Sequence, residues 1–154
     1  MRVYIGADHA GFQLKQELVR RLAEAGHEVH DVGAATLDPE DDYSPYCLNT
    51  GALVVADPGS LGVVIGGSGN GEQIAANKVP GVRAALVWNR DTARLAREHN
   101  DANVVAIGAR MHSMDDACNL VSLFLATAFS GSDRHVRRIG EISAYEETHT
   151  LPPV

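Results

Sequence analysis

A glycine-rich stretch at residues 66–72, Gly-Gly-Ser-Gly-Asn-Gly-Glu, holds the side chains whose types and spacing best suggest chemistry. It follows an apolar run and precedes Ile-Ala-Ala, which predicts a buried strand, a tight turn and the start of a helix. The backbone N–H groups of such a turn, together with the helix dipole, favour an anion. Beside them, the Glu72 carboxylate could take a proton next to a carbonyl, while Ser68 and the backbone N–H groups hold the enediolate oxygen.

Three better-known glycine motifs do not fit this stretch. The dinucleotide fingerprint needs a glycine where Glu72 stands, and a Walker loop needs a lysine there. The nucleophile elbow fits Gly66 and Ser68 but then meets Asn70. The remaining alternative is a tight turn in which Glu72 only complements the helix dipole, which is worth about 0.3–1 kcal/mol.

Asp8 and His9 directly follow the first predicted strand, in Gly-Ala-Asp-His-Ala-Gly. In a parallel sheet this places them at the same carboxyl edge as the glycine-rich stretch. A carboxylate and an imidazole there could bind sugar hydroxyls or help a ring to open. Alternatively, Asp8 caps the first helix and His9 is a surface residue beside it.

Three arginines begin the last predicted helix, and Arg134 and Arg138 share one of its faces. Like charges at this spacing destabilise a helix by about 0.2–0.5 kcal/mol, so an anion is expected to compensate. Guanidinium groups match phosphate oxygens well. The alternative is pairing with Glu141 or with a neighbouring chain. Arg110, which follows the fifth strand at the carboxyl edge, could join the cluster.

His99 and Asn100 end the helix that precedes the fifth strand. This position lies at the amino edge of a parallel sheet, opposite the glycine-rich stretch. Within one chain the two residues cannot easily reach that stretch. They either form an ordinary helix C-terminus, which the residue types alone favour, or serve the site of a second subunit.

Strands and helices alternate along the chain, and the strands are apolar throughout. This predicts a doubly wound, Rossmann-like three-layer α/β/α sandwich with a five-stranded parallel sheet, in a single domain of residues 1–154. The predicted strands are 2–6, 27–32, 63–65, 82–88 and 104–107. The predicted helices are 12–25, 46–56, a short one ending near 78, 91–100, 113–128 and 134–149. Lys15 is expected to point outward, and the acidic loop 33–45 is expected to be exposed.

The composition argues against nucleic-acid-binding, membrane-spanning and secreted classes of protein. The net charge of −7 argues against nucleic acid as a partner. There is no apolar run long enough for a membrane and no visible secretory signal, which predicts a cytoplasmic domain. Cys47 and Cys118 lack metal-ligand spacing, so we expect buried reduced thiols and no metal.

Together these motifs resemble ribose-5-phosphate isomerase B, within the wider group of ribose-, allose- and galactose-phosphate isomerases. The resemblance rests on four motifs in order: Gly-Ala-Asp-His-Ala-Gly, Gly-Gly-Ser-Gly-Asn-Gly-Glu-Gln, Arg-Glu-His-Asn and Arg-His-x-x-Arg. It spans nearly the whole chain, and the loop looks most like the actinobacterial branch. The resemblance implies a cofactor-free and metal-free isomerase of the pentose phosphate pathway that interconverts ribose 5-phosphate and ribulose 5-phosphate.

The resemblance also implies a role for each matched position. Glu72 would move the proton between C1 and C2, and His99 would assist ring opening as an acid. The implied substrate-binding residues are Asp8, His9, Gly67, Ser68, Gly69, Asn70, Gly71, Asn100, Arg110, Arg134 and Arg138. Since the family is dimeric with shared sites, His99 would complete the partner's site, and the last helix would pack on a partner subunit.

The chain departs from much of the family at the base. Many members carry a cysteine where this chain has Gly66, and an apolar residue at the position of Glu72, so a cysteine-dependent mechanism is excluded here. A free glutamate has a pKa of about 4.3, and a helix N-terminus is expected to lower it further.

Other functions remain open at this point. The enzyme could instead isomerise a six-carbon sugar phosphate such as allose 6-phosphate. A flavodoxin-like small-molecule-binding domain without catalysis would use the same fold and anion site. A universal-stress-type nucleotide-binding module is disfavoured by the missing phosphate fingerprints.

Overall fold

A five-stranded, all-parallel sheet organises the protein in the computed structural model, which describes residues 1–153. The strands are β1 (Arg2–Ala7), β2 (Glu28–Asp31), β3 (Leu61–Gly66), β4 (Ala84–Leu86) and β5 (Val104–Gly108). Every residue of β3 and β5 is buried, as expected for central strands that are covered on both faces. The predicted parallel sheet is therefore confirmed.

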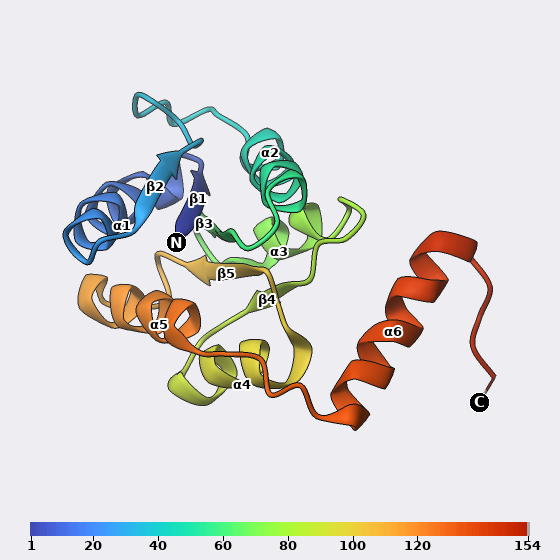
Figure 1. The fold of residues 1–154 in the computed structure, drawn as a ribbon. Coiled ribbons are helices and arrows are strands. Elements are labelled where there is room, and N and C mark those ends of the chain that lie inside the picture. Colours follow the sequence, from blue (N-terminus) through green and yellow to red (C-terminus); the bar gives the residue numbers. More distant parts are fainter. Residues whose placement is uncertain (154) are drawn as a thin grey trace.

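Helices cover both faces of the sheet and complete the predicted three layers (Figure 1). They are α1 (Phe12–Glu24), α2 (Tyr43–Ala56), α3 (Asn70–Ala76), α4 (Arg90–Asn100), α5 (Met114–Ala126) and α6 (Asp133–Thr148), with a short 3₁₀ turn, η1 (His9–Gly11), before α1. One apolar core joins the sheet to α1, α4 and α5 through residues such as Leu18, Ala93 and Phe124. The other joins it to α2 and α3 through Cys47 and Ala76.

The strand order is β2-β1-β3-β5-β4. From β1 the chain winds to β2 on one side, then crosses back and places β3 on the other side of β1. The gap between the carboxyl ends of β1 and β3 is thus a topological switch point, where doubly wound proteins bind ligands. The flavodoxin-like order is 2-1-3-4-5, so the last two strands are exchanged relative to a flavodoxin-like fold.

Several predicted boundaries were wrong for local reasons. Helix α2 begins at Tyr43 rather than residue 46, because Pro45 is tolerated in a first turn, where backbone N–H groups lack helical partners anyway. Strand β4 covers only Ala84–Leu86, although Val82 and Val87 on either side of it are buried.

Lys15 was predicted to point outward, and this was wrong. Its side chain is fully buried, and its Nζ lies 2.7 Å from Asp31 Oδ2 and 2.6 Å from the Ala34 carbonyl oxygen. A buried ammonium group requires such partners. The ion pair ties α1 to the end of β2 and to the start of the β2–α2 connection.

Helix α6 stands away from the body of the molecule (Figure 1). His135 is its one buried residue, whereas Val136, Ile142 and Tyr145 are exposed. Cys47 and Cys118 are buried free thiols, as predicted. Among residues 1–153, no helix has the length and apolar character needed to cross a membrane.

Candidate active site

The glycine-rich loop leaves the carboxyl end of β3 and turns directly into α3. Gly69 is the N-cap of α3 and has a φ of 84°, a left-handed conformation that favours glycine. Ser68 is exposed, and its Oγ accepts a hydrogen bond from the Asn70 N–H at 3.3 Å. A cavity of about 470 Å³ opens beside Ser68 and Asn70, so both residues face accessible space.

Glu72 lies in the first turn of α3 but points into the protein, with only 4% of its surface exposed. A Cβ atom on Gly66 would lie 1.7 Å from Glu72 Oε1, so the carboxylate fills the space that a side chain at position 66 would need. Its Oε2 is buried and has no hydrogen-bond partner among residues 1–153.

The electrostatic surroundings of Glu72 contradict the lowered pKa expected from the sequence. Burial raises the pKa of this carboxyl, and the nearby Asp8 raises it further. Hydrogen bonds from backbone groups of Gly69 and Glu72 lower the pKa but do not offset these two effects. A carboxylate with a raised pKa is a stronger base at neutral pH. The site therefore contains a buried carboxylate with a raised pKa.

Asp8 and His9 lie at the end of β1, on the same edge as the glycine-rich loop. Asp8 Oδ1 accepts hydrogen bonds from the N–H groups of Ala10 at 3.0 Å and Gly11 at 3.3 Å. Asp8 therefore caps the short turn η1, whereas the N-cap of α1, the helix it was expected to cap, is Gly11. His9 is half-buried, with its Nδ1 2.8 Å from Asp41 Oδ1. The hydrogen bond to Asp41 raises the pKa of His9.

Asp41, Tyr43 and Tyr46, whose hydroxyl interacts with Asp41, are residues near the site that the sequence analysis missed. The acidic loop was expected to be exposed, yet the Asp41 side chain is only 10% exposed and contacts His9. The Tyr43 hydroxyl lies against Gly71, where an added Cβ would come within 2.7 Å of it. All three follow β2, and the crossover back to β3 returns this segment to the switch point. The crossover is the only signal that could have identified them.

Arg110 also lies where the sequence predicted. It follows β5, its N–H donates to the Gly67 carbonyl oxygen at 3.1 Å, and its Nη1 would be 3.4 Å from a Cβ on Gly67. The carboxyl edge thus gathers three carboxylates (Asp8, Asp41 and Glu72) with His9 and Arg110.

The remaining predicted residues lie elsewhere. His99 and Asn100 end α4, ahead of β5, and therefore occupy the amino edge of the sheet. The His99 ring packs against the His135 ring of α6 at an interplanar angle of 37°, with ring centroids 4.3 Å apart. Arg134 Nε donates to His135 Nε2 at 3.2 Å. One chain therefore does not bring His99, Asn100, Arg134 or Arg138 to Glu72.

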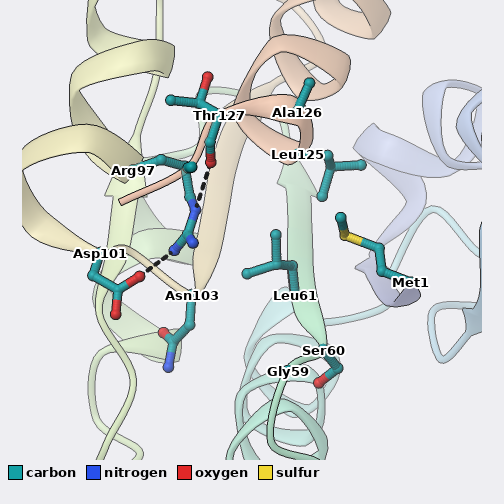
Figure 2. A pocket seen from close by; sticks show the side chains of 11 residues that line it. Met1, Gly59, Ser60, Leu61, Arg97, Asp101, Asn103, Leu125, Ala126 and Thr127 are labelled. Atoms are coloured by element: carbon teal, nitrogen blue, oxygen red, sulfur yellow. Dashed lines mark hydrogen bonds and ion pairs between the residues drawn. The ribbon is translucent and has the colours of Figure 1, made fainter. Parts of the chain in front are cut away.

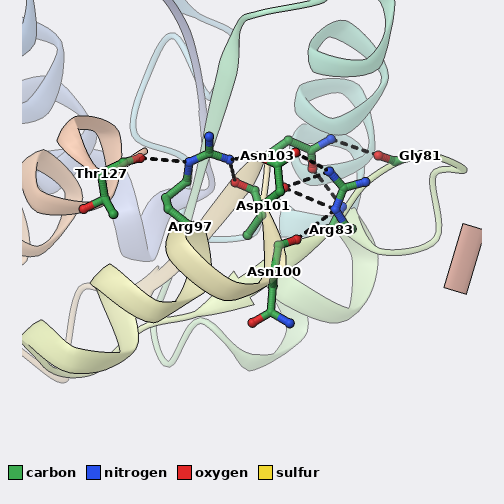
Figure 3. A network of polar contacts seen from close by, with 8 residues as sticks. Gly81, Arg83, Arg97, Asn100, Asp101, Asn103 and Thr127 are labelled. Carbon is green, nitrogen blue, oxygen red and sulfur yellow. Dashed lines mark hydrogen bonds and ion pairs between the residues drawn. The ribbon is translucent and has the colours of Figure 1, made fainter. Parts of the chain in front are cut away.

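A polar network fixes this end of α4 (Figure 3). Arg83 donates to the carbonyl oxygens of Asn100 and Asp101, and Arg97 Nη1 donates to Asp101 Oδ1 at 2.8 Å. Asp101 has a φ of 43°. A cavity of about 450 Å³ lies at the same amino edge, beside Met1, Leu61 and Asn103 (Figure 2), and is separate from the Glu72 site.

One group of side chains in the described part of the chain has metal-ligand geometry. Asp8, His9 and Asp41 each offer one side-chain atom able to bind a metal ion, and these three atoms lie within 4.8 Å of one another. The hydrogen bond between His9 and Asp41 accounts for most of this closeness, and the Oδ1 atom of Asp8 is committed to backbone N–H groups.

Fold and site together define a doubly wound α/β protein with a glycine-rich loop and a buried carboxylate at the topological switch point. The family described as Ribose/Galactose Isomerase matches residues 3–142. The chain belongs to this family.

Individual relatives agree with that assignment. The chain is 55% identical to ribose-5-phosphate isomerase B of Mycobacterium tuberculosis H37Rv, over 100% of this chain and 95% of the relative. Ribose-5-phosphate isomerase B of Clostridium thermocellum superposes with a TM-score of 0.92 at 41% identity, covering 97% and 100% of the two chains. The Mycoplasma genitalium enzyme, solved with bound ribulose 5-phosphate, gives a TM-score of 0.91 at 36% identity and covers 96% and 97%.

Proposed function

We propose that the protein interconverts D-ribose 5-phosphate and D-ribulose 5-phosphate through an enediolate, with Glu72 as the base. The observation that carries the proposal is the buried Glu72 carboxylate beside a glycine-rich loop at the switch point. The names of the relatives support the substrate, and membership of the family supports the reaction class.

The proposed reaction moves one proton along the substrate. Glu72 removes the proton from C2 of the open-chain aldose, the C–H electron pair forms the C1–C2 double bond, and the carbonyl pair moves to O1. The proton on O2 then moves to O1. Return of the proton from Glu72 to C1, as the electron pair on O2 forms the C2 carbonyl, gives the ketose. Because hydrogen and electrons are only redistributed within the substrate, the balance requires no external oxidant or reductant.

The loop would stabilise the charge that develops on oxygen. Its backbone N–H groups and the Ser68 hydroxyl are donors held in place before the substrate arrives, which is the usual source of the largest rate enhancement. Asp8, His9 and Arg110 would bind the sugar phosphate at the same edge. A buried base beside fixed donors favours enediolate chemistry over simple binding.

The site also needs an acid for ring opening and cations for the phosphate. We assign these to His99, Asn100, Arg134 and Arg138 of a second subunit, so that a homodimer carries two shared sites. Supporting this, the four residues lie at the opposite edge of their own chain, and α6 exposes Val136, Ile142 and Tyr145 to solvent. A cytoplasmic location stays a prediction.

The proposal is tested by proton NMR of ribose 5-phosphate in D₂O with the protein and excess EDTA. We expect ribulose 5-phosphate to appear, with deuterium at the exchanging carbon. Turnover of allose 6-phosphate alone would keep the mechanism and change the substrate. Absence of exchange with both sugars would contradict the proposal and favour a binding domain.

A further inference from the structure

The acidic segment before α2 makes a specific contact with His9 that neither the family motifs nor the proposed mechanism assigns. A single oxygen, Asp41 Oδ1, accepts a hydrogen bond from the His9 backbone N–H at 2.9 Å and lies 2.8 Å from His9 Nδ1. This double contact fixes both the backbone and the ring of His9. Because a carboxylate oxygen only accepts hydrogen bonds, Nδ1 must carry a proton.

The other ring nitrogen is free for a ligand. His9 Nε2 has no hydrogen-bond partner within residues 1–153, and 30% of the side chain is exposed. With Nδ1 held by Asp41, the ring plane is fixed and Nε2 is the atom that remains available. A protonated Nε2 would donate a hydrogen bond to an anionic oxygen.

The charges around the ring favour the imidazolium form. Among residues 1–153, two charged groups face the ring, and both are carboxylates. One is Asp41, from the β2–α2 connection, and the other is Asp8, at the end of β1, whose Oδ2 lies 3.9 Å from His9 Nδ1. Although burial opposes it, hydrogen bonding from His9 lowers the pKa of Asp41, so Asp41 stays ionised. A carboxylate this close stabilises the positive form of an imidazole.

We propose that Asp41 is a positioning residue that holds His9 as an imidazolium ion with Nε2–H directed at an anionic oxygen of the substrate. The proposal deepens the proposed function and rests on it for its kinetic consequence. It also gives the carboxyl edge, which carries three carboxylates, a second cation beside Arg110. Without that cation, an anionic substrate would meet mainly negative charge at this edge.

The test compares Asp41→Asn with Asp42→Asn. Both variants remove one negative charge from the same segment, but Asp42 is exposed and its side chain makes no capping hydrogen bond. The histidine ring signals are titrated by NMR in the free protein, with His9 assigned through a His9→Gln variant. We expect Asp41→Asn to lower the pKa of His9 by about one unit or more, and the control to leave it unchanged.

The kinetic arm measures kcat/KM for ribose 5-phosphate between pH 6 and pH 8. At pH values above the pKa of His9, lowering that pKa by one unit reduces the protonated fraction about tenfold. The kcat/KM of Asp41→Asn should therefore be about tenfold below that of wild type at pH 8, and much closer to it at pH 6. A role in folding alone would reduce activity equally at every pH.

The outcomes separate the two proposals. An unchanged His9 titration, or a loss that is independent of pH, would overturn the role of Asp41. If Asp41→Asn shifts the His9 titration but the wild-type protein isomerises neither sugar, the proposed function is overturned and the pairing of Asp41 with His9 stands. Dispersed histidine signals in the same spectra report that each variant is folded.

Discussion

The two edges of the sheet differ in chemistry. The carboxyl edge has a glycine-rich loop and three carboxylates, one of which is the buried Glu72, but only His9 and Arg110 as described cationic or titratable partners. The amino edge has His99 and Asn100 at the end of α4, and Arg134 and Arg138 on the exposed helix α6. Within residues 1–153, no buried carboxylate lies near them. This difference is the basis of the proposed dimer, in which each chain would carry two halves of different sites and pairing of two chains would complete them.

The largest expected effect comes from removing the base at the carboxyl edge. Glu72→Gln keeps the side-chain shape but cannot accept the proton, so kcat should fall by about 10²–10⁴-fold, the usual contribution of general acid–base catalysis. KM should change little. Steady-state kinetics measure this, with Glu40→Gln in the exposed loop as a charge-matched control. Retained turnover would show that another residue is the base.

Gly66→Ala should have the next largest effect, because its Cβ would overlap the Glu72 carboxylate. Displacing that group by about 1 Å is expected to cost about 10²-fold in kcat. In a Glu72→Gln background the same change should add little, since the base is already lost. Equal losses in both backgrounds would mean that Gly66 serves only the fold.

The proposed phosphate-binding role of the amino edge predicts a smaller effect. Arg138 is exposed and makes no ion pair within residues 1–153, whereas its neighbour Arg137 pairs with Glu141 at 3.7 Å. Arg138→Ala should raise KM by about 10- to 100-fold, as expected for a lost charge-assisted hydrogen bond of about 1.5–3 kcal/mol. Arg137→Ala is the control and should leave KM unchanged. Equal KM values for both variants would remove Arg138 from the site.

The smallest expected effect is on stability. Because the pKa of Glu72 is raised in the folded protein, the native state binds this proton more tightly than the unfolded chain does. The stabilisation is present below the unfolded pKa and is lost as the pH rises through the folded pKa. Glu72→Gln should therefore unfold at a slightly higher temperature than wild type at pH 7, with the difference shrinking towards pH 4. Thermal unfolding followed by circular dichroism checks this. A variant less stable at pH 7 would contradict it.

The sequence predicted the architecture and the carboxyl-edge loop because both depend on local patterns. Apolar runs bounded by glycines mark the strands, and their order along the chain places Asp8, Glu72 and Arg110 at one edge. The order of β4 and β5 was not predictable, because both are short apolar strands and nothing local selects which pairs with β3.

The missed residues depend on tertiary contacts. Asp41 resembles its exposed acidic neighbours in sequence, and only the return of the β2–α2 connection to the switch point brings it to His9. Lys15 is buried because Asp31 and Ala34 happen to lie across from it. The raised pKa of Glu72 likewise follows from burial in the space left by Gly66, which the position in the first turn of a helix does not reveal.

The central claim, that opposite edges of two chains form one site, is tested most directly by mixing Glu72→Gln and His99→Ala homodimers under exchange and measuring isomerase activity. One site of each verified heterodimer would then combine an intact Glu72 with an intact His99. We predict recovery to about half of the wild-type activity per heterodimer, since one of its two sites is restored. If verified heterodimers stay as inactive as the parent variants, the two edges do not form a shared site.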